Sequence, residues 1–130
     1  MKTISLQEPY ATLIKEGYKK VETRSWKTTY RGDILIHASQ GKKFLKGIDN
    51  PEVLDLIKGL ELNNGSIICK ATLVDCIEMT KDFINQAKRN HQEYILGIYE
   101  EGRYAWILEN ISPIKPIKVP GKLGLWDYNI

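Results

Sequence analysis

The order of its strand-like segments constrains the fold of this chain more than any other feature. Residues 66–79, SIICKATLVDCIEM, are the longest candidate strand. Other alternating or β-branched segments precede and follow it, and stretches with helical spacing lie between some of them. The other expected strands cover 2–6, 19–26, 31–39, 104–111 and 114–119. Because strands and helices come in mixed order, the sequence predicts an α+β fold with a small curled sheet or barrel rather than a parallel α/β fold.

Helix-boundary residues mark several of the segments between these strands. Pro9 is suited to a first helical turn, and Gly17 is suited to a C-terminal cap. Pro51 lies near the start of a second helix, and Thr80 is the expected N-cap of a third. A polar stretch covers residues 41–50. The expected helices cover 7–17, 51–62 and 80–90, with a short helical or irregular piece over 93–99.

The length and composition fit one globular domain over residues 1–130. The chain is 42% apolar and 27% charged, and no internal repeat or linker divides it. No apolar run approaches the roughly 20 residues that span a bilayer. A glutamate and a proline interrupt the N-terminus before a signal-like segment develops. We therefore expect a single domain with no membrane partner, located in the cytoplasm.

The two cysteines, Cys69 and Cys76, indicate a reduced compartment. On an uninterrupted strand they would lie about 23 Å apart, beyond the reach of a disulfide. Their odd spacing also predicts that they point to opposite faces, each as a small buried hydrophobic residue. Neither has a second Cys or a His at metal-ligand spacing, so we expect no metal and no cofactor.

Basic charge is concentrated in the first part of the chain. The net charge is +3, but residues 1–48 hold ten Lys/Arg against four Asp/Glu, and residues 49–130 hold nine against twelve. The two parts therefore carry +6 and −3. Such an asymmetry is typical of proteins that bind polyanions, although it also serves solubility.

Residues 17–33, GYKKVETRSWKTTYRGD, place cations and aromatic rings around a lone acid, Glu22. Period two puts Lys20, Glu22 and Arg24 on one face of a strand and Lys19 on the other. One interpretation is an exposed strand with a surface ion pair, which contributes little. The alternative is a ligand site, because aromatic rings stack on bases while cations bind phosphate.

The ligand-site interpretation extends to Trp26, Tyr30 and Arg31, which follow the same strand. His37 lies between apolar neighbours, which favours a half-buried histidine with its hydrogen bonds satisfied. A lysine on a low-dielectric rim could act as a base, with Glu22 in the complementary acid/base role, but no third positioned group is evident. The sequence holds no Gly-rich phosphate loop and no nucleophile-elbow motif.

These residues resemble the activating signal cointegrator homology (ASCH) domain. The signature Gly-x-Lys-x-x-Glu-x-Arg corresponds to Gly17, Lys19, Glu22 and Arg24. The following Trp26, the Arg31-Gly32 pair and the Ile36-His37-Ala38 strand also agree, as do the segments GRYAWILENI and GKLGLW. The likeness covers about two thirds of the chain and is weakest through 41–64 and 80–98.

The resemblance implies a PUA-like fold, a curled mixed or antiparallel β-barrel with flanking helices and a cleft beside the first helix. The family is associated with RNA, and some members resemble amidohydrolases acting on N4-acetylated cytidine or ribonucleases. Lys19 matches the lysine of the amidohydrolase group, but Glu22 stands where that group has threonine. If the chain is an enzyme, Lys19 and Glu22 are the expected catalytic residues.

The sequence therefore predicts an ASCH-domain module that binds RNA, a nucleotide or a nucleoside, with a hydrolase as the alternative. A protein-binding adaptor would instead require a large exposed apolar patch. The expected ligand-binding residues are Lys19, Glu22, Arg24, Trp26, Tyr30, Arg31 and His37.

Overall fold

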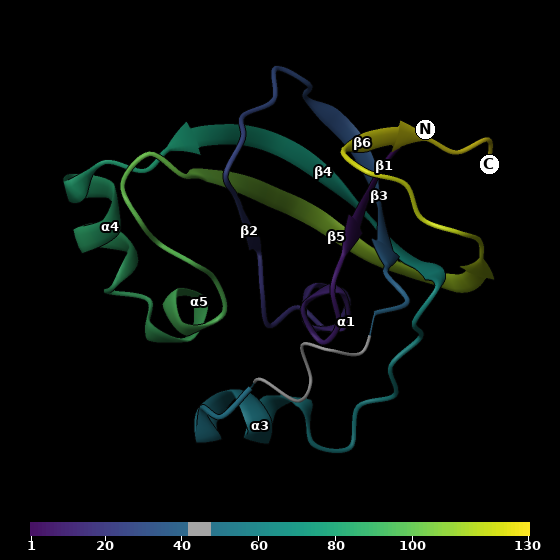
Figure 1. Ribbon diagram of the computed structural model, residues 1–130, viewed down its shortest axis with the longest axis horizontal. Coiled ribbons are helices and arrows are strands. Elements are labelled where there is room, and N and C mark those ends of the chain that lie inside the picture. Colours follow the sequence, from purple (N-terminus) through teal and green to yellow (C-terminus); the bar gives the residue numbers. More distant parts are fainter. Residues whose placement is uncertain (42–47) are drawn as a thin grey trace.

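The computed structural model describes residues 1–41 and 48–130 as a curled six-stranded sheet with helices around it (Figure 1). The sheet order is β2-β5-β4-β3-β1-β6. The β1 and β3 strands are parallel, and every other neighbouring pair is antiparallel. The strands are β1 (Lys2–Leu6), β2 (Val21–Arg24), β3 (Gly32–Ala38), β4 (Ser66–Glu78), β5 (Tyr104–Lys118) and β6 (Leu125–Asp127). The expected α+β class with a curled, mixed sheet is confirmed.

Four helices are described, and they follow the boundary signals of the sequence. The Gly17 backbone has φ +83, which ends the first helix as expected. The Thr80 side chain accepts a hydrogen bond from the Phe83 backbone N–H at 3.1 Å, which confirms this N-cap. The polar stretch at 41–50 falls largely outside the described residues. The helices are α1 (Tyr10–Lys15), α3 (Pro51–Ile57), α4 (Lys81–Ala87) and α5 (His91–Ile95).

The β5 strand corrects the expectation of two strands over 104–111 and 114–119. It is one strand of 15 residues paired along its length with β4. The pairing advances from Glu109 to Ser112 on β5 while β4 advances by only two residues, and Asn110 there has φ 53. This bulge, and a further register shift near Pro113, let β5 continue through prolines that would interrupt a regular ladder.

Bulges also correct the expected orientation of the two cysteines. Cys69 is fully buried in the main core cluster, and Cys76 is half-buried against the same cluster rather than on the opposite face. A register shift between Leu73 and Asp75 adds one residue to β4, so the odd spacing no longer reverses the side chain. Both cysteines are free thiols.

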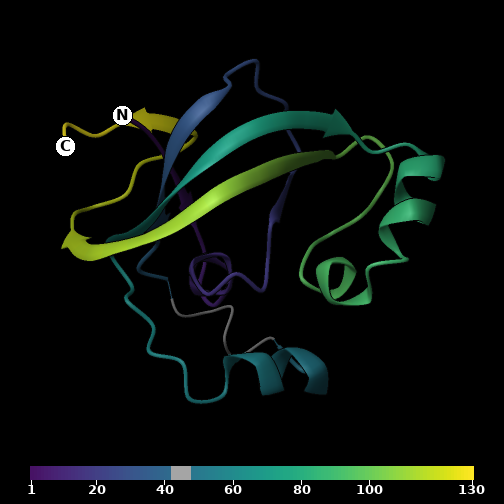
Figure 2. The same cartoon turned by 180° about the vertical axis from the view of Figure 1, so that it is seen from behind.

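The main core lies between the concave side of the sheet and α1 (Figure 2). Helix α1 is buried along almost its whole length and packs against β3, β4 and β5. A smaller cluster of Leu13, Val53 and Leu96 joins α1, α3 and the end of α5. Within residues 1–41 and 48–130, no helix has the length and apolar character needed to cross a membrane.

Candidate functional site

Lys19 lies just before β2, with its amine buried in the interior. Its side chain is 1% exposed, and Nζ donates hydrogen bonds to the carbonyls of Val21 and Leu96, both at 2.6 Å. Nζ also lies 3.8 Å from Oε1 of Glu22. The sequence had placed Lys19 and Glu22 on opposite strand faces. That prediction is wrong because β2 begins only at Val21, so strand alternation does not extend to Lys19.

Burial is the main influence on the Lys19 amine, and it lowers the pKa of this group. The carboxylates of Glu22 and Glu93 oppose that effect because they stabilise the ammonium, whereas the Arg24 guanidinium adds to the lowering. The Tyr10 ring lies beneath the amine, 5.8 Å from Nζ to the ring centroid. The amine is therefore held by two carbonyls, a carboxylate and an aromatic face.

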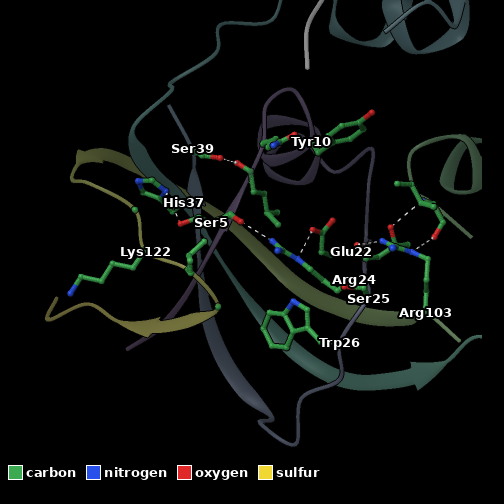
Figure 3. Close-up of a pocket in the computed structure, with 18 of the residues that line it drawn as sticks. Ser5, Tyr10, Glu22, Arg24, Ser25, Trp26, His37, Ser39, Arg103 and Lys122 are labelled. Atoms are coloured by element: carbon green, nitrogen blue, oxygen red, sulfur yellow. Dashed lines mark hydrogen bonds and ion pairs between the residues drawn. The ribbon is translucent and has the colours of Figure 1, made fainter. Parts of the chain in front are cut away.

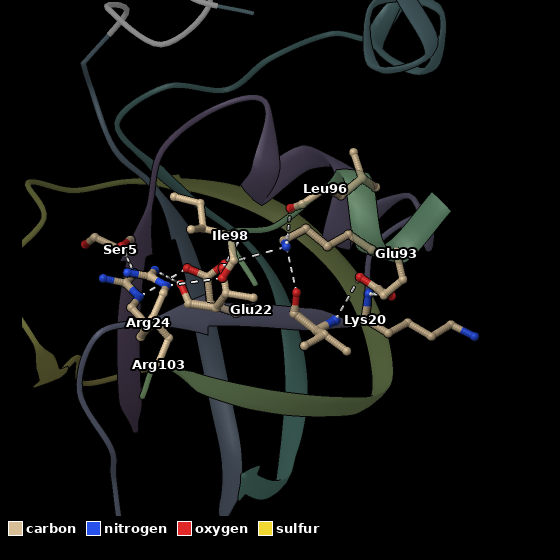
Figure 4. Close-up of polar contacts among 11 residues, drawn as sticks. Ser5, Lys20, Glu22, Arg24, Glu93, Leu96, Ile98 and Arg103 are labelled. Atoms are coloured by element: carbon tan, nitrogen blue, oxygen red, sulfur yellow. Dashed lines mark hydrogen bonds and ion pairs between the residues drawn. The ribbon is translucent and has the colours of Figure 1, made fainter. Parts of the chain in front are cut away.

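Glu22 lies between two cations. Its Oε2 is 3.1 Å from Nε of Arg24, and its Oε1 faces Lys19 (Figure 4). The Arg24 Nη2 in turn donates to the Ser5 carbonyl at 2.7 Å. The Nε–H of Arg24 is buried and makes no hydrogen bond, so the 3.1 Å approach is an ion pair without aligned donor geometry. The Glu22 carboxylate is thus held on β2 by positive charge from both sides.

The segment from α5 to Ile98 is tied to β2 by side chains. The Glu93 carboxylate accepts the backbone N–H groups of Lys20 at 2.8 Å and Val21 at 3.3 Å. Further along, the Ile98 N–H donates to the Thr23 hydroxyl at 3.0 Å. These contacts bring a segment more than seventy residues away in sequence alongside the strand that carries Glu22 and Arg24.

A cleft of about 1000 Å³ opens in front of these residues (Figure 3). Its walls come from β2, from residues 95–98, from the segment joining β1 to α1, and from residues 120–124. The charged residues among the described lining are Glu22, Arg24, Arg103 and Lys122, and its large aromatic rings are Tyr10 and Trp26. The cleft therefore combines three cations, one carboxylate and two aromatic faces.

The structure brings four of the seven expected ligand-binding residues to this cleft: Glu22, Arg24, Trp26 and His37. Lys19 lies behind the wall and is not among the described lining residues.

Tyr30 and Arg31 also lie outside the described lining. The Tyr30 hydroxyl donates to the Asp33 carbonyl at 2.5 Å, and Arg31 pairs with Asp75 at 3.5 Å. Both residues therefore make local contacts around the β2–β3 connection, and their part in ligand binding stays a prediction.

His37 is fully buried and has a partner on each ring nitrogen. Nδ1 lies 3.1 Å from the Ser5 hydroxyl, and Nε2 lies 2.7 Å from the Val119 carbonyl. The Trp126 indole N–H donates to the same Ser5 hydroxyl at 3.1 Å. The expectation of a histidine with satisfied hydrogen bonds is confirmed, and its burial is complete rather than partial.

Several cleft residues were not expected from the sequence: Ser5, Tyr10, Arg103 and Lys122. All four lie outside residues 17–33, and the spacing within that stretch does not point to them. Glycine within GKLGLW is consistent with either a close backbone approach or a tight turn. In agreement, a Cβ on Gly121 would lie 2.7 Å from the Ser5 hydroxyl and from Cε1 of His37. Within the described ranges, no group of three or more His, Cys, Asp or Glu residues could hold a metal.

Comparisons with known proteins agree with this architecture. The sequence model of the ASCH domain matches residues 4–118. Activating signal cointegrator 1 from Homo sapiens is 29% identical over 131 residues, which cover 98% of this chain and 22% of that protein. The same protein from Mus musculus is 24% identical over the same shares of both chains. This chain thus spans about a fifth of the length of these curated relatives.

Solved structures show the same fold. The crystal structure of ASCH from Zymomonas mobilis superposes with a TM-score of 0.57 at 24% identity, covering 90% of this chain and 72% of that chain. A mutant form of that protein gives a TM-score of 0.57 at 24% identity, over 91% and 73% of the two chains. The family match covers most of the sequence, and the curled mixed sheet with its helices is the PUA-like fold. The chain therefore belongs to the ASCH domain family.

Proposed function

We propose that this ASCH domain binds RNA or a nucleotide in the cleft described above. The observation that carries the proposal is the convergence of Arg24, Arg103 and Lys122 with the Trp26 ring in one cavity of about 1000 Å³. Guanidinium and ammonium groups bind phosphate, and aromatic rings stack on bases. The association of the ASCH family with RNA supports the same ligand class.

Glu22 has a distinct role in this proposal. Its carboxylate is held by Arg24 and Lys19, and it lines the cleft as an acceptor. A carboxylate accepts hydrogen bonds from the exocyclic amino groups of bases, as it does from cytosine N4. Lys19 supports the ligand indirectly by holding Glu22. Tyr30 and Arg31 contact the ligand only where an RNA strand continues past the cleft.

The test is fluorescence anisotropy with a labelled single-stranded oligoribonucleotide at several salt concentrations. Lys122→Gln removes an exposed cation of the cleft, and Lys115→Gln removes an exposed cation of β5 outside the described lining. We expect Lys122→Gln to weaken binding. The slope of log affinity against log salt concentration should also become shallower by about 0.7, because the loss of one phosphate contact means that fewer counterions are released on binding. Lys115→Gln should leave the affinity and its salt dependence unchanged. Absence of binding at low salt, or equal effects of the two variants, would contradict the proposal.

A second candidate is amide hydrolysis on a modified nucleoside such as N4-acetylcytidine. One observation favours it: burial lowers the pKa of Lys19, which helps a lysine act as a base or nucleophile. Two observations oppose it. The Lys19 amine is engaged by two carbonyls, and Glu22 occupies the position where the amidohydrolase group has threonine.

The assay follows turnover of N4-acetylcytidine by the wild type, Lys19→Ala and Glu22→Thr. We expect little or no turnover by the wild type. A gain of hydrolysis in Glu22→Thr would identify a binding protein on an enzyme scaffold. Rapid wild-type turnover that Lys19→Ala leaves unchanged would exclude a catalytic Lys19. The labelled RNA of the binding experiment, analysed for shortened fragments, tests ribonuclease activity in the same preparation.

We further propose that residues 1–130 act as one domain in a reducing compartment, the cytoplasm. The free thiols of Cys69 and Cys76 support the compartment. The pairing of β6 with β1 supports a single unit, since it joins the two ends of the chain. A single cooperative unfolding transition, seen by both fluorescence and circular dichroism, is the expected result.

A further inference from the structure

The cleft contains a serine and a histidine in contact, an arrangement that ligand binding alone does not need. Ser5 on β1 and His37 on β3 are direct partners in the parallel pairing of these strands, so their side chains share one face of the sheet. The hydroxyl and Nδ1 are 3.1 Å apart, and both residues line the cleft (Figure 3). The hydroxyl is thus within hydrogen-bond reach of a base at a solvent-accessible cavity.

The partners of the histidine fix which nitrogen carries the proton. The Val119 carbonyl can only accept, so Nε2 of His37 carries the hydrogen and donates it over 2.7 Å. In the neutral ring Nδ1 is then the acceptor, and the Ser5 hydroxyl donates to it. The same Val119 carbonyl stabilises the imidazolium that forms when Nδ1 takes a proton. Ser5, His37 and the Val119 carbonyl are thus arranged as a nucleophile, a base and a group that orients the base.

The surroundings of Ser5 favour negative charge on its oxygen. The Trp126 indole N–H donates to Oγ at 3.1 Å, and it would stabilise a developing alkoxide. The Arg24 guanidinium donates to the Ser5 backbone carbonyl at 2.7 Å, so a cation is held next to this residue and is available to a substrate oxyanion. Gly121 packs against the pair so closely that a Cβ at this position would lie 2.7 Å from the Ser5 hydroxyl and from Cε1 of His37.

We propose that Ser5 is a nucleophile activated by His37 and that the cleft hydrolyses a carboxylic ester. Ser5 Oγ attacks the carbonyl carbon while its proton passes to Nδ1 of His37. The C–O bond to the alcohol then breaks, and the alcohol leaves with that proton, which gives an acyl-Ser5 ester. Water attacks this ester, again giving a proton to Nδ1, and the acid departs as Ser5 regains its hydrogen.

The charges of the cleft define the substrate class. Arg24, Arg103 and Lys122 require an anionic group, so the ester joins an acyl group to an alcohol that bears phosphate. This part of the inference rests on the proposed nucleotide site. The nucleophile itself does not, because it follows from the contacts of Ser5 and His37 alone.

The test is covalent labelling of the wild-type chain with a fluorophosphonate, which loses fluoride as the serine oxygen bonds to phosphorus. Peptide mass spectrometry locates the adduct. Ser39 is the internal control, because it lines the same cleft but its hydroxyl donates to the Leu6 carbonyl at 2.9 Å and has no histidine partner in the described contacts. We expect modification of Ser5 and not of Ser39. No adduct at Ser5, or equal adducts on both serines, would overturn the proposal.

Variants distinguish the loss of the His37 base from a loss of folding. His37→Gln should slow labelling of Ser5 by about 100-fold or more, the usual contribution of a general base. Ser112→Ala, at an exposed serine of β5 outside the described lining, should label at the wild-type rate. Circular dichroism checks that each variant is folded, and the wild-type adduct stands as evidence even where a variant is not. Labelling of Ser5 by a chain that fails to bind RNA would overturn only the proposed nucleotide ligand, whereas RNA binding without labelling would overturn only the nucleophile.

Discussion

Replacing Lys19 by methionine should destabilise the domain strongly, although the change keeps a side chain of similar length. Methionine cannot donate the hydrogen bonds that the amine makes to the Val21 and Leu96 carbonyls, both at 2.6 Å. It also removes the partner of Glu22 at 3.8 Å. The Leu96 carbonyl belongs to the cleft wall, so the lysine connects that wall to β2 from the interior.

The size of the effect follows from these contacts. A hydrogen bond from a charged donor contributes about 1.5–3 kcal/mol, so two give a gross loss of about 3–6 kcal/mol. Part of this loss is offset, because burying methionine does not carry the desolvation cost of burying an ammonium. We therefore expect a net loss on the order of 3 kcal/mol. For a chain of 130 residues, this lowers the melting temperature by roughly 10 °C.

Lys20→Met is the matched control, because Lys20 is the neighbouring residue and its side chain is exposed. Exposed substitutions of this kind change stability by no more than about 0.5 kcal/mol. Urea unfolding of both variants gives the free-energy difference, and hydrogen exchange reports whether the amides of residues 96–98 lose protection first. If the unfolding free energies of Lys19→Met and Lys20→Met differ by less than about 1 kcal/mol, the proposed link between the Lys19 amine and the cleft wall is wrong. The same experiment shows whether lost activity in any Lys19 variant reflects chemistry or unfolding.

Three further predictions concern other parts of the fold. Burial raises the pKa of Cys69 to about 12 from 9.0, so the folded chain keeps a proton that the unfolded chain releases. Stability should fall as pH rises above 9, by about 1.4 kcal/mol per pH unit from this group, and urea titrations of Cys69→Ala should show a shallower fall. Gly121→Ala should lower the melting temperature and perturb the His37 ring signals by NMR, because its Cβ would lie 2.7 Å from that ring, and an unchanged spectrum would refute the contact. Thr80→Ala should cost about 1 kcal/mol in urea unfolding through loss of the α4 N-cap, whereas Thr80→Ser should be nearly neutral.

The sequence predicted the features that depend on short-range patterns. The Thr80 cap, the Gly17 helix end and the strand containing His37 follow from local residue preferences, and the structure has all three. The single β5 strand was not predicted, because proline within a run normally indicates a break. Bulges that accommodate it depend on the partner strand β4 and cannot be read from one segment.

The cleft was predictable only in part for the same reason. Glu22, Arg24 and Trp26 are close in sequence, so their grouping was visible. Arg103 and Lys122 reach the cleft only through the tertiary fold; their segments, GRYAWILENI and GKLGLW, resemble the family but did not indicate that these two side chains line a cleft. Lys19 was placed on the wrong face because β2 begins only at Val21, where its pairing with β5 starts, and that boundary depends on the partner strand rather than on the local sequence.

The contacts between β2 and the α5 segment have a consequence for self-association. A strand at the border of a sheet can recruit a strand from another molecule through its unpaired backbone groups. At the start of β2 the Glu93 carboxylate already accepts the backbone N–H groups of Lys20 and Val21, and Arg103 approaches the Thr23 carbonyl at 3.4 Å. The opposite border is β6, which is only three residues long and carries an ion pair between Lys2 and Asp127 at its margin. Both borders are thus poor templates for strand addition, and exchanging Glu93 for alanine should open one of them to aggregation.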